Sequence, residues 1–154
     1  MEWAALVAWI VTAGGGFVLL AMWLARGGMR QGGGQRVIRP PLILSHFLLA
    51  ATGLVVWIIY LVTDSDALGW IALGALGVVA VLGFGMFGVW FSERQRRSIG
   101  AAGSEPATVG GAAPGQPAVP AEQHFPIPIV ALHGLLAVVT VALVFLTDIG
   151  VGGS

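Results

Sequence analysis

Four long segments without a charged residue constrain this chain more than any other feature of its sequence. They contain no Asp, Glu, Lys or Arg, and they run over Trp3–Ala25, Pro41–Val62, Ala67–Phe91 and Ile127–Thr147. About 20 apolar residues form a helix long enough to cross a hydrocarbon core about 30 Å thick. Charged residues make up only 9% of the chain, against roughly 25% in soluble domains. The sequence therefore predicts an all-α fold, a four-helix transmembrane bundle.

The charged residues are sorted between the two sides of these segments. The seven arginines form two groups, one after the first span and one after the third: Arg26, Arg30, Arg36 and Arg39, then Arg94, Arg96 and Arg97. Four acidic residues flank the opposite span ends: Glu2, Asp64, Asp66 and Asp148. Because cytoplasmic loops carry the excess of basic residues, we expect a multi-pass protein of the cytoplasmic (inner) membrane with both termini extracytoplasmic.

Tryptophans near the span ends are expected to mark the two membrane interfaces, where such amphipathic rings are enriched. Trp23 and Trp90 would lie at the cytoplasmic boundary, whereas Trp3, Trp57, Tyr60 and Trp70 would lie at the outer one. This distribution agrees with the orientation that the arginines indicate.

The second and fourth spans share the pattern P-x4-H-x-L-L-A, which starts at Pro41 in one span and at Pro128 in the other. The first and third spans share a second pattern, in which Gly16 corresponds to Gly83. Both patterns indicate an internal duplication. It predicts a bundle built from two parallel two-span repeats, related by an axis along the membrane normal.

The chain between the third and fourth spans is rich in Ala, Gly and Pro and shows no apolar periodicity. Such a composition is typical of a flexible linker. We therefore expect residues 1–97 to hold the first repeat and the third span, residues 98–123 to form a flexible cytoplasmic linker, and residues 124–154 to supply the fourth span of the same bundle.

His46 and His133 are the only ionisable side chains within the four spans. They lie roughly 10 and 13 Å inside the expected cytoplasmic boundary, at 1.5 Å per helical residue. A polar side chain at that depth is costly and usually faces the bundle interior, so it marks a candidate functional site.

A b-type haem needs two imidazole nitrogens on opposite faces of a flat apolar ring, and helix bundles build such sites from facing helices. His46 and His133 are therefore the candidate axial ligands of the haem iron. Gly16 and Gly83 stand at the same level, where a missing side chain would leave room for the ring. Arg39 is placed to meet a propionate at the cytoplasmic surface.

In its topology and its paired histidines, His46 and His133, the chain resembles small membrane b-type cytochromes of the b561 kind. The resemblance implies haem b as cofactor and electron transfer as function. Members of that family have four haem ligands for two haems, whereas these spans can assemble one bis-histidine site. The Pro-x4-His and His-Phe-Pro patterns also resemble small uncharacterised four-span proteins of GC-rich Gram-positive bacteria, a likeness that implies no activity.

Other interpretations of the histidines stay open. They can be structural, in a non-catalytic accessory or scaffold subunit, or they can line a proton or small-solute pathway or bind a metal ion. The spans hold no catalytic constellation, and His124 is expected to be solvated at the interface rather than ligating. Expected partners are membrane lipid and, for an accessory subunit, a larger membrane complex or a second copy of the chain, but no nucleic acid.

Overall fold

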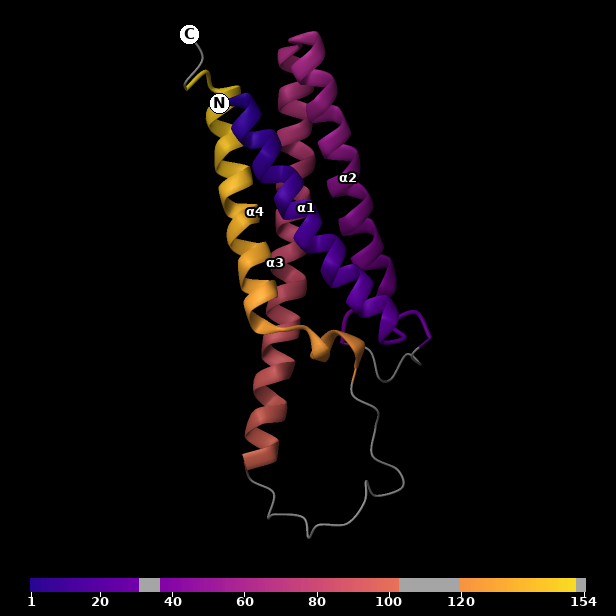
Figure 1. Cartoon of the computed structure of the whole chain (residues 1–154). Coiled ribbons are helices and arrows are strands. Elements are labelled where there is room, and N and C mark those ends of the chain that lie inside the picture. Colours follow the sequence, from indigo (N-terminus) through magenta and orange to yellow (C-terminus); the bar gives the residue numbers. More distant parts are fainter. Residues whose placement is uncertain (31–36, 103–119, 152–154) are drawn as a thin grey trace.

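The computed structural model of the chain describes residues 1–30, 37–102 and 120–151 (Figure 1). All regular elements in these ranges are helices: α1 (Glu2–Ala25), α2 (Pro40–Thr63), α3 (Asp66–Ala102), the short 3-10 helix η2 (Ala121–His124) and α4 (Ile127–Asp148). Each of the four α-helices is long and apolar enough to cross a membrane. The protein is therefore an integral membrane protein with four spans, and the predicted all-α four-helix class is confirmed.

Local sequence explains where the helices begin and end. Prolines occupy the first turn of α2 and of α4, where the missing N–H of proline would have no helical partner in any case. The first helix is followed by Gly27, whose positive φ of 74° suits glycine best. Asp64 adopts the left-handed conformation after α2 and turns the chain directly into α3.

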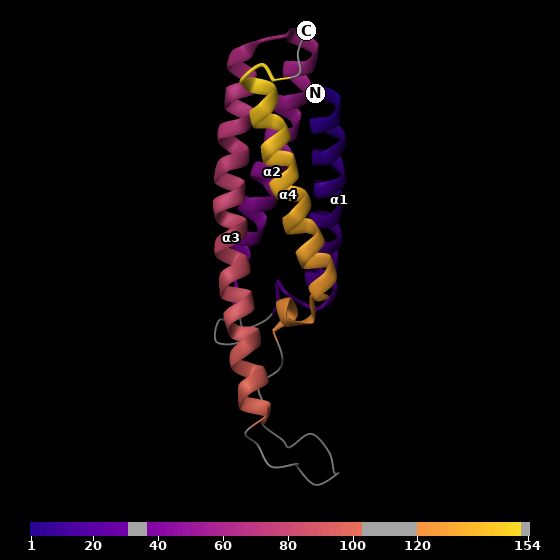
Figure 2. The same cartoon turned by 90° about the vertical axis from the view of Figure 1, so that its left-hand side faces the viewer.

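Each long helix packs against two neighbours. Figure 1 and Figure 2 show α1 beside α2 and α4, and the close backbone contacts also join α3 to α2 and α4. Within the described residues, no such contact joins α1 to α3 or α2 to α4, so these two pairs lie on the diagonals. The helices of each diagonal pair run in the same direction. The histidine-bearing helices α2 and α4 are thus parallel and diagonally opposed.

The two ends of the bundle differ in charge and in packing. We call the end with Glu2, Asp64, Asp66 and Asp148 the acidic end, and the end with Arg26, Arg30, Arg39 and Arg94 the arginine end. The cluster of buried apolar side chains lies in the half of the bundle next to the acidic end: Ala5, Trp9, Trp57, Tyr60, Ala72, Leu76 and Val144. Further apolar side chains are buried at the arginine end: Trp23, Ile38, Trp90 and Ala121. The histidines therefore lie between two buried regions.

The third helix is longer than the sequence indicated. It continues to Ala102, past residue 98, where the linker was expected to begin. Arg97 donates a hydrogen bond to Glu93 at 3.0 Å one turn earlier, and such i,i+4 pairs stabilise an exposed helix. The far end of the expected linker also differs, because Ala121–His124 form η2. Residues 103–119 lie outside the described part of the chain.

Three of the five tryptophans expected at the membrane interfaces are buried inside the protein. Trp3 and Trp70 are exposed, as interfacial residues should be, but Trp23, Trp57 and Trp90 are almost completely buried inside the protein. A span that is apolar on all sides gives no periodic signal for its inner face. The position of a tryptophan along a span therefore did not reveal which way its ring points.

Candidate functional site

The two histidines occupy matching positions on their helices. His46 lies six residues after Pro40, the first residue of α2, and His133 lies six residues after Ile127, the first residue of α4. At 1.5 Å per residue, both are about 9 Å into the helix from the arginine end. The diagonal helices thus present both imidazoles to one level of the bundle.

The imidazole of His133 packs against α1. A Cβ atom added to Gly16 would lie 3.0 Å from its Cε1, and one added to Gly15 would lie 3.5 Å from its Nδ1. The same Nδ1 lies 3.0 Å from the main-chain oxygen of Thr12. A carbonyl oxygen can only accept, so Nδ1 carries the proton and the neutral ring keeps a lone pair on Nε2.

The imidazole of His46 packs against α3 in a similar way. A Cβ atom added to Gly83 would lie 3.1 Å from its Cε1. Its Nδ1 is buried and has no hydrogen-bond partner. The main chain of Val79, which corresponds to Thr12, lies at the limit of hydrogen-bonding range of this ring.

A second polar contact ties α1 to α4 one layer closer to the acidic end. The Thr12 and Thr140 hydroxyls lie 3.0 Å apart, and both are buried. Each also lies within 2.8 Å of a carbonyl oxygen of its own helix. Sequence reasoning missed this pair. The available signal was that both are hydroxyl residues inside otherwise apolar spans.

Four of the five expected site residues lie in two separate pairs. Gly16 adjoins His133 and Gly83 adjoins His46, so each glycine seats the imidazole of a neighbouring helix. Arg39 is exposed at the start of α2, and none of the described hydrogen bonds or ion pairs joins it to the histidines.

His124, expected to be solvated, is exposed in the structure. Its Nδ1 lies 3.2 Å from the main-chain oxygen of Pro120, within its own connecting segment. It therefore does not join the histidine pair.

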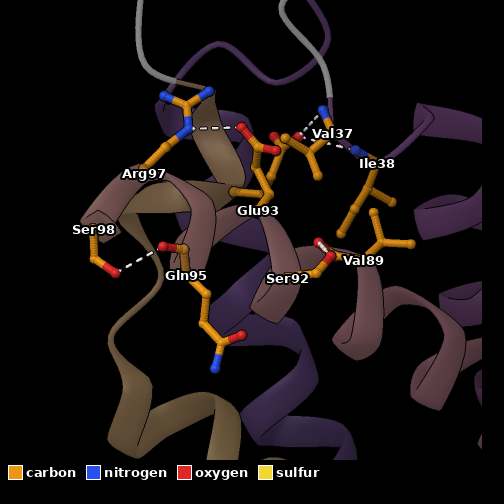
Figure 3. Close-up of polar contacts among 9 residues, drawn as sticks. Val37, Ile38, Val89, Ser92, Glu93, Gln95, Arg97 and Ser98 are labelled. Carbon is orange, nitrogen blue, oxygen red and sulfur yellow. Dashed lines mark hydrogen bonds and ion pairs between the residues drawn. The ribbon is translucent and has the colours of Figure 1, made fainter. Parts of the chain in front are cut away.

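A buried carboxylate closes the arginine end of the bundle, and sequence reasoning missed it because Glu122 fell in the expected linker. Its Oε1 accepts hydrogen bonds from the main-chain N–H groups of Val37, at 2.6 Å, and Ile38, at 3.0 Å (Figure 3). Its main-chain oxygen accepts a bond from Nε1 of Trp90 at 2.8 Å. We call these four residues the Glu122 clip. The clip joins the α1–α2 connection to α3 and to the segment before α4.

A cavity of about 130 Å³ lies at the acidic end, far from the histidines. Its lining consists of Tyr60, Asp66, Trp70, Thr147, Asp148 and Gly150. The Tyr60 hydroxyl beside it lies 3.4 Å from Oε1 of Glu2. This cavity contains none of the expected ligand residues, so it is not the site that the sequence predicted.

Metal binding by side chains alone is not supported among the described residues, since none of their His, Asp and Glu side chains form a group of three or more suited to a metal ion. Two imidazoles are too few for a closed zinc site. A comparison of the chain with protein-family models, with curated proteins and with solved structures found no match.

Proposed function

We propose that this membrane protein binds one b-type haem between His46 and His133 and serves as an electron-transfer cytochrome. The observation that carries the proposal is the bond from Nδ1 of His133 to the main-chain oxygen of Thr12. It commits the proton to Nδ1 and leaves Nε2 with a lone pair, the state in which imidazole binds a metal. Bound haem supplies one-electron redox chemistry. The chain would hold the ring, orient it and exclude water.

The packing at the histidine level supports the same proposal. His46, His133, Gly16 and Gly83 are only partly buried, and they lie between the buried apolar cluster of the acidic half and the buried Trp23 and Trp90 of the arginine end. Helices α2 and α4 make no close backbone contact, so a flat apolar ring between them need not break an existing helix–helix interface.

Burial at corresponding positions supports the proposal that the bundle consists of two parallel two-span repeats. Residues 67 apart on α1 and α3, and 87 apart on α2 and α4, are buried together: Ala5 with Ala72, Trp9 with Leu76, Trp23 with Trp90, and Trp57 with Val144. The same offsets relate His133 on Gly16 to His46 on Gly83. A two-fold axis along the bundle would place the two histidines at one depth.

The orientation in the membrane is part of the proposal. The arginine end would face the cytoplasm by the positive-inside rule, with both termini on the outer side of the cytoplasmic membrane. The haem would then lie in the inner half of the bilayer. Arg39, exposed at this end, is free of described contacts with the bundle and is available to a propionate or to an anionic lipid head group.

The absorption spectrum of the purified protein tests the proposal. Protein from cells supplied with haem precursor should show a sharp Soret band and split visible bands on reduction, because two imidazoles give six-coordinate low-spin iron. Changing either His46 or His133 to Ala should weaken or abolish this spectrum. His124→Ala is the matched control, since this histidine is exposed outside the bundle. Colourless wild-type protein would overturn the proposal.

A second candidate function is that of a non-catalytic accessory or scaffold subunit with structural histidines. The observation that favours it is that each imidazole already rests on a neighbouring helix, with His133 bonded to Thr12. Interhelical hydrogen bonds in membranes contribute about 0.6–2 kcal/mol. On this alternative, His133→Ala should destabilise colourless protein by that amount, and the protein should co-purify with a larger membrane complex.

A further inference from the structure

The cavity at the acidic end is formed by residues of α2, α3 and α4 and is separate from the histidines. Its volume is about 130 Å³, and its lining combines two carboxylates, two aromatic rings, a hydroxyl group and a glycine: Asp66, Asp148, Tyr60, Trp70, Thr147 and Gly150. A cavity of about 150 Å³ holds a molecule as large as benzene. The space at the acidic end therefore suits a small organic group of a few heavy atoms.

The carboxylate of Asp148 has an oxygen without a partner at this cavity. Oδ2 of Asp148 is buried, and none of the described residues forms a hydrogen bond with it. The other oxygen, Oδ1, lies so close to α3 that a Cβ atom added to Gly69 would be only 2.6 Å from it. A buried charged acceptor is costly unless a donor or an opposite charge meets it. The glycine at position 69 thus leaves room for a carboxylate that lacks its donor.

The acidic end supplies almost no positive charge of its own. In the sequence, all seven arginines flank the other ends of the spans, and the chain has no lysine. The cationic group that the chain does place at this end is the amino group of Met1, and no described ion pair joins it to Asp66 or Asp148. The carboxylates of the acidic end therefore attract a cation from outside the protein.

The chemistry of the lining selects among cations. The described His, Asp and Glu side chains form no group of three or more suited to a metal ion. The Thr147 hydroxyl donates to the main-chain oxygen of Leu143 at 2.8 Å, so its oxygen can serve a ligand only as an acceptor, as the carboxylates do. Acceptors beside aromatic rings fit a cation with N–H donors and hydrocarbon, because ammonium groups pair with carboxylates and lie favourably over Tyr and Trp rings.

We propose that the cavity at the acidic end binds a primary ammonium group through Asp148 and Asp66, with the adjoining carbon atoms against Tyr60 and Trp70. The ends of membrane helices lie at the level of the lipid head groups. Two sources therefore offer this chemistry, the ethanolamine head group of a phospholipid and a free alkylamine. The site uses neither histidine, so its occupation does not depend on haem.

Isothermal titration calorimetry with n-propylammonium, on purified protein in phosphatidylcholine nanodiscs, tests the site. Saturable binding is expected, and tetramethylammonium, which has no N–H donor, should bind at least about tenfold more weakly. Asp148→Asn should lower the affinity for propylammonium at least about tenfold, since it removes a charged acceptor. Gly69→Ala should also lower it, because the new methyl group would displace the Asp148 carboxylate while the charge of the protein stays the same.

Asp64→Asn is the matched control and should bind propylammonium as the wild type does. Asp64 is exposed at the same end and does not line the cavity. Its backbone is left-handed, with φ of 53°, a conformation that asparagine adopts readily. The control therefore makes the same change of charge as Asp148→Asn without altering the cavity or the fold.

Nanodiscs that contain phosphatidylethanolamine distinguish the two sources. If propylammonium binds more weakly in them than in phosphatidylcholine, the lipid head group competes for the cavity and is its occupant. If the affinity is the same in both, the site takes a free amine. Both results support a primary ammonium site, because both require saturable binding that Asp148→Asn weakens.

Three results would overturn the inference. They are the absence of saturable binding, equal losses in Asp64→Asn and Asp148→Asn, and equally tight binding of tetramethylammonium. The second would show that cations are drawn only to the overall negative charge of this end. Protein that binds propylammonium and is colourless would keep the inference and remove the proposed haem function, so the two proposals fail separately.

Discussion

Replacing Glu122 with alanine is expected to loosen the connection between the two halves of the bundle at the arginine end. Glu122 is 1% exposed, and its Oε1 is the acceptor for the N–H groups of Val37 and Ile38. Alanine keeps the backbone of η2, and so keeps the bond from Trp90 to the main-chain oxygen. The substitution therefore removes the side-chain half of the Glu122 clip and leaves the main-chain half in place.

The size of the effect follows from the burial of the groups that lose a partner. A buried N–H group left unsatisfied costs about 1–3 kcal/mol. The bond from Ile38 is buried, but the bond from Val37 is only partly buried, so water can replace the second acceptor. Alanine also removes the buried Oε2, which has no partner, and this returns roughly 1 kcal/mol. The expected net loss is about 1 kcal/mol.

The free energy of unfolding in detergent micelles, followed by tryptophan fluorescence during titration with a denaturing detergent, measures this loss. Glu122→Gln keeps one oxygen acceptor and should lose less free energy than Glu122→Ala. Glu93→Ala is the matched control, because it removes only the exposed ion pair with Arg97, worth about 0.3–0.5 kcal/mol. If Glu122→Ala and Glu93→Ala lose the same free energy, the buried bonds contribute nothing and the reasoning fails.

Three other measurements test separate parts of the structure. A reporter fused after Ser154 should be extracytoplasmic and one inserted in the linker cytoplasmic, because the seven arginines lie on one side; the reverse result would contradict the orientation. Gly16→Ala should lower the melting temperature relative to Gly85→Ala. The new methyl group at position 16 would lie 3.0 Å from the His133 ring, whereas one at position 85 would have nothing within 4 Å. Equal melting temperatures would contradict the packing of the His133 ring against Gly16. Thr140→Val should cost about 0.6–1.7 kcal/mol of helix-pairing energy, and no loss would show that its bond to α1 is not formed.

The sequence by itself determined the class of protein and the extent of its spans. The second span was predicted as Pro41–Val62 and is found as Pro40–Thr63, and the fourth was predicted as Ile127–Thr147 and is found as Ile127–Asp148. These boundaries were readable because hydrocarbon tolerates no exposed backbone polar groups, so a run of about 20 apolar residues leaves few alternatives to a helix. The third helix was underestimated because its last turns lie beyond the apolar run and are stabilised as an exposed, charged helix.

The candidate site was only partly readable from the sequence. His46 and His133 stood out because ionisable residues are rare inside spans, and their repeated spacing placed them at matching positions. Their partners were not readable. A main-chain oxygen such as that of Thr12 exists at every residue, and nothing in the sequence distinguishes the one that bonds His133. That choice depends on how α1 and α4 pack.

The tertiary structure alone decided which faces point inward and which distant segments meet. Spans that are apolar on all sides carry no amphipathic signal, so the burial of Trp23, Trp57 and Trp90 was hidden from sequence reasoning. Glu122 lay in a segment whose composition is typical of a linker, yet it bonds Val37, 85 residues earlier in the chain. Composition describes what a segment can do alone, whereas burial of a carboxylate depends on the N–H groups that folding brings beside it.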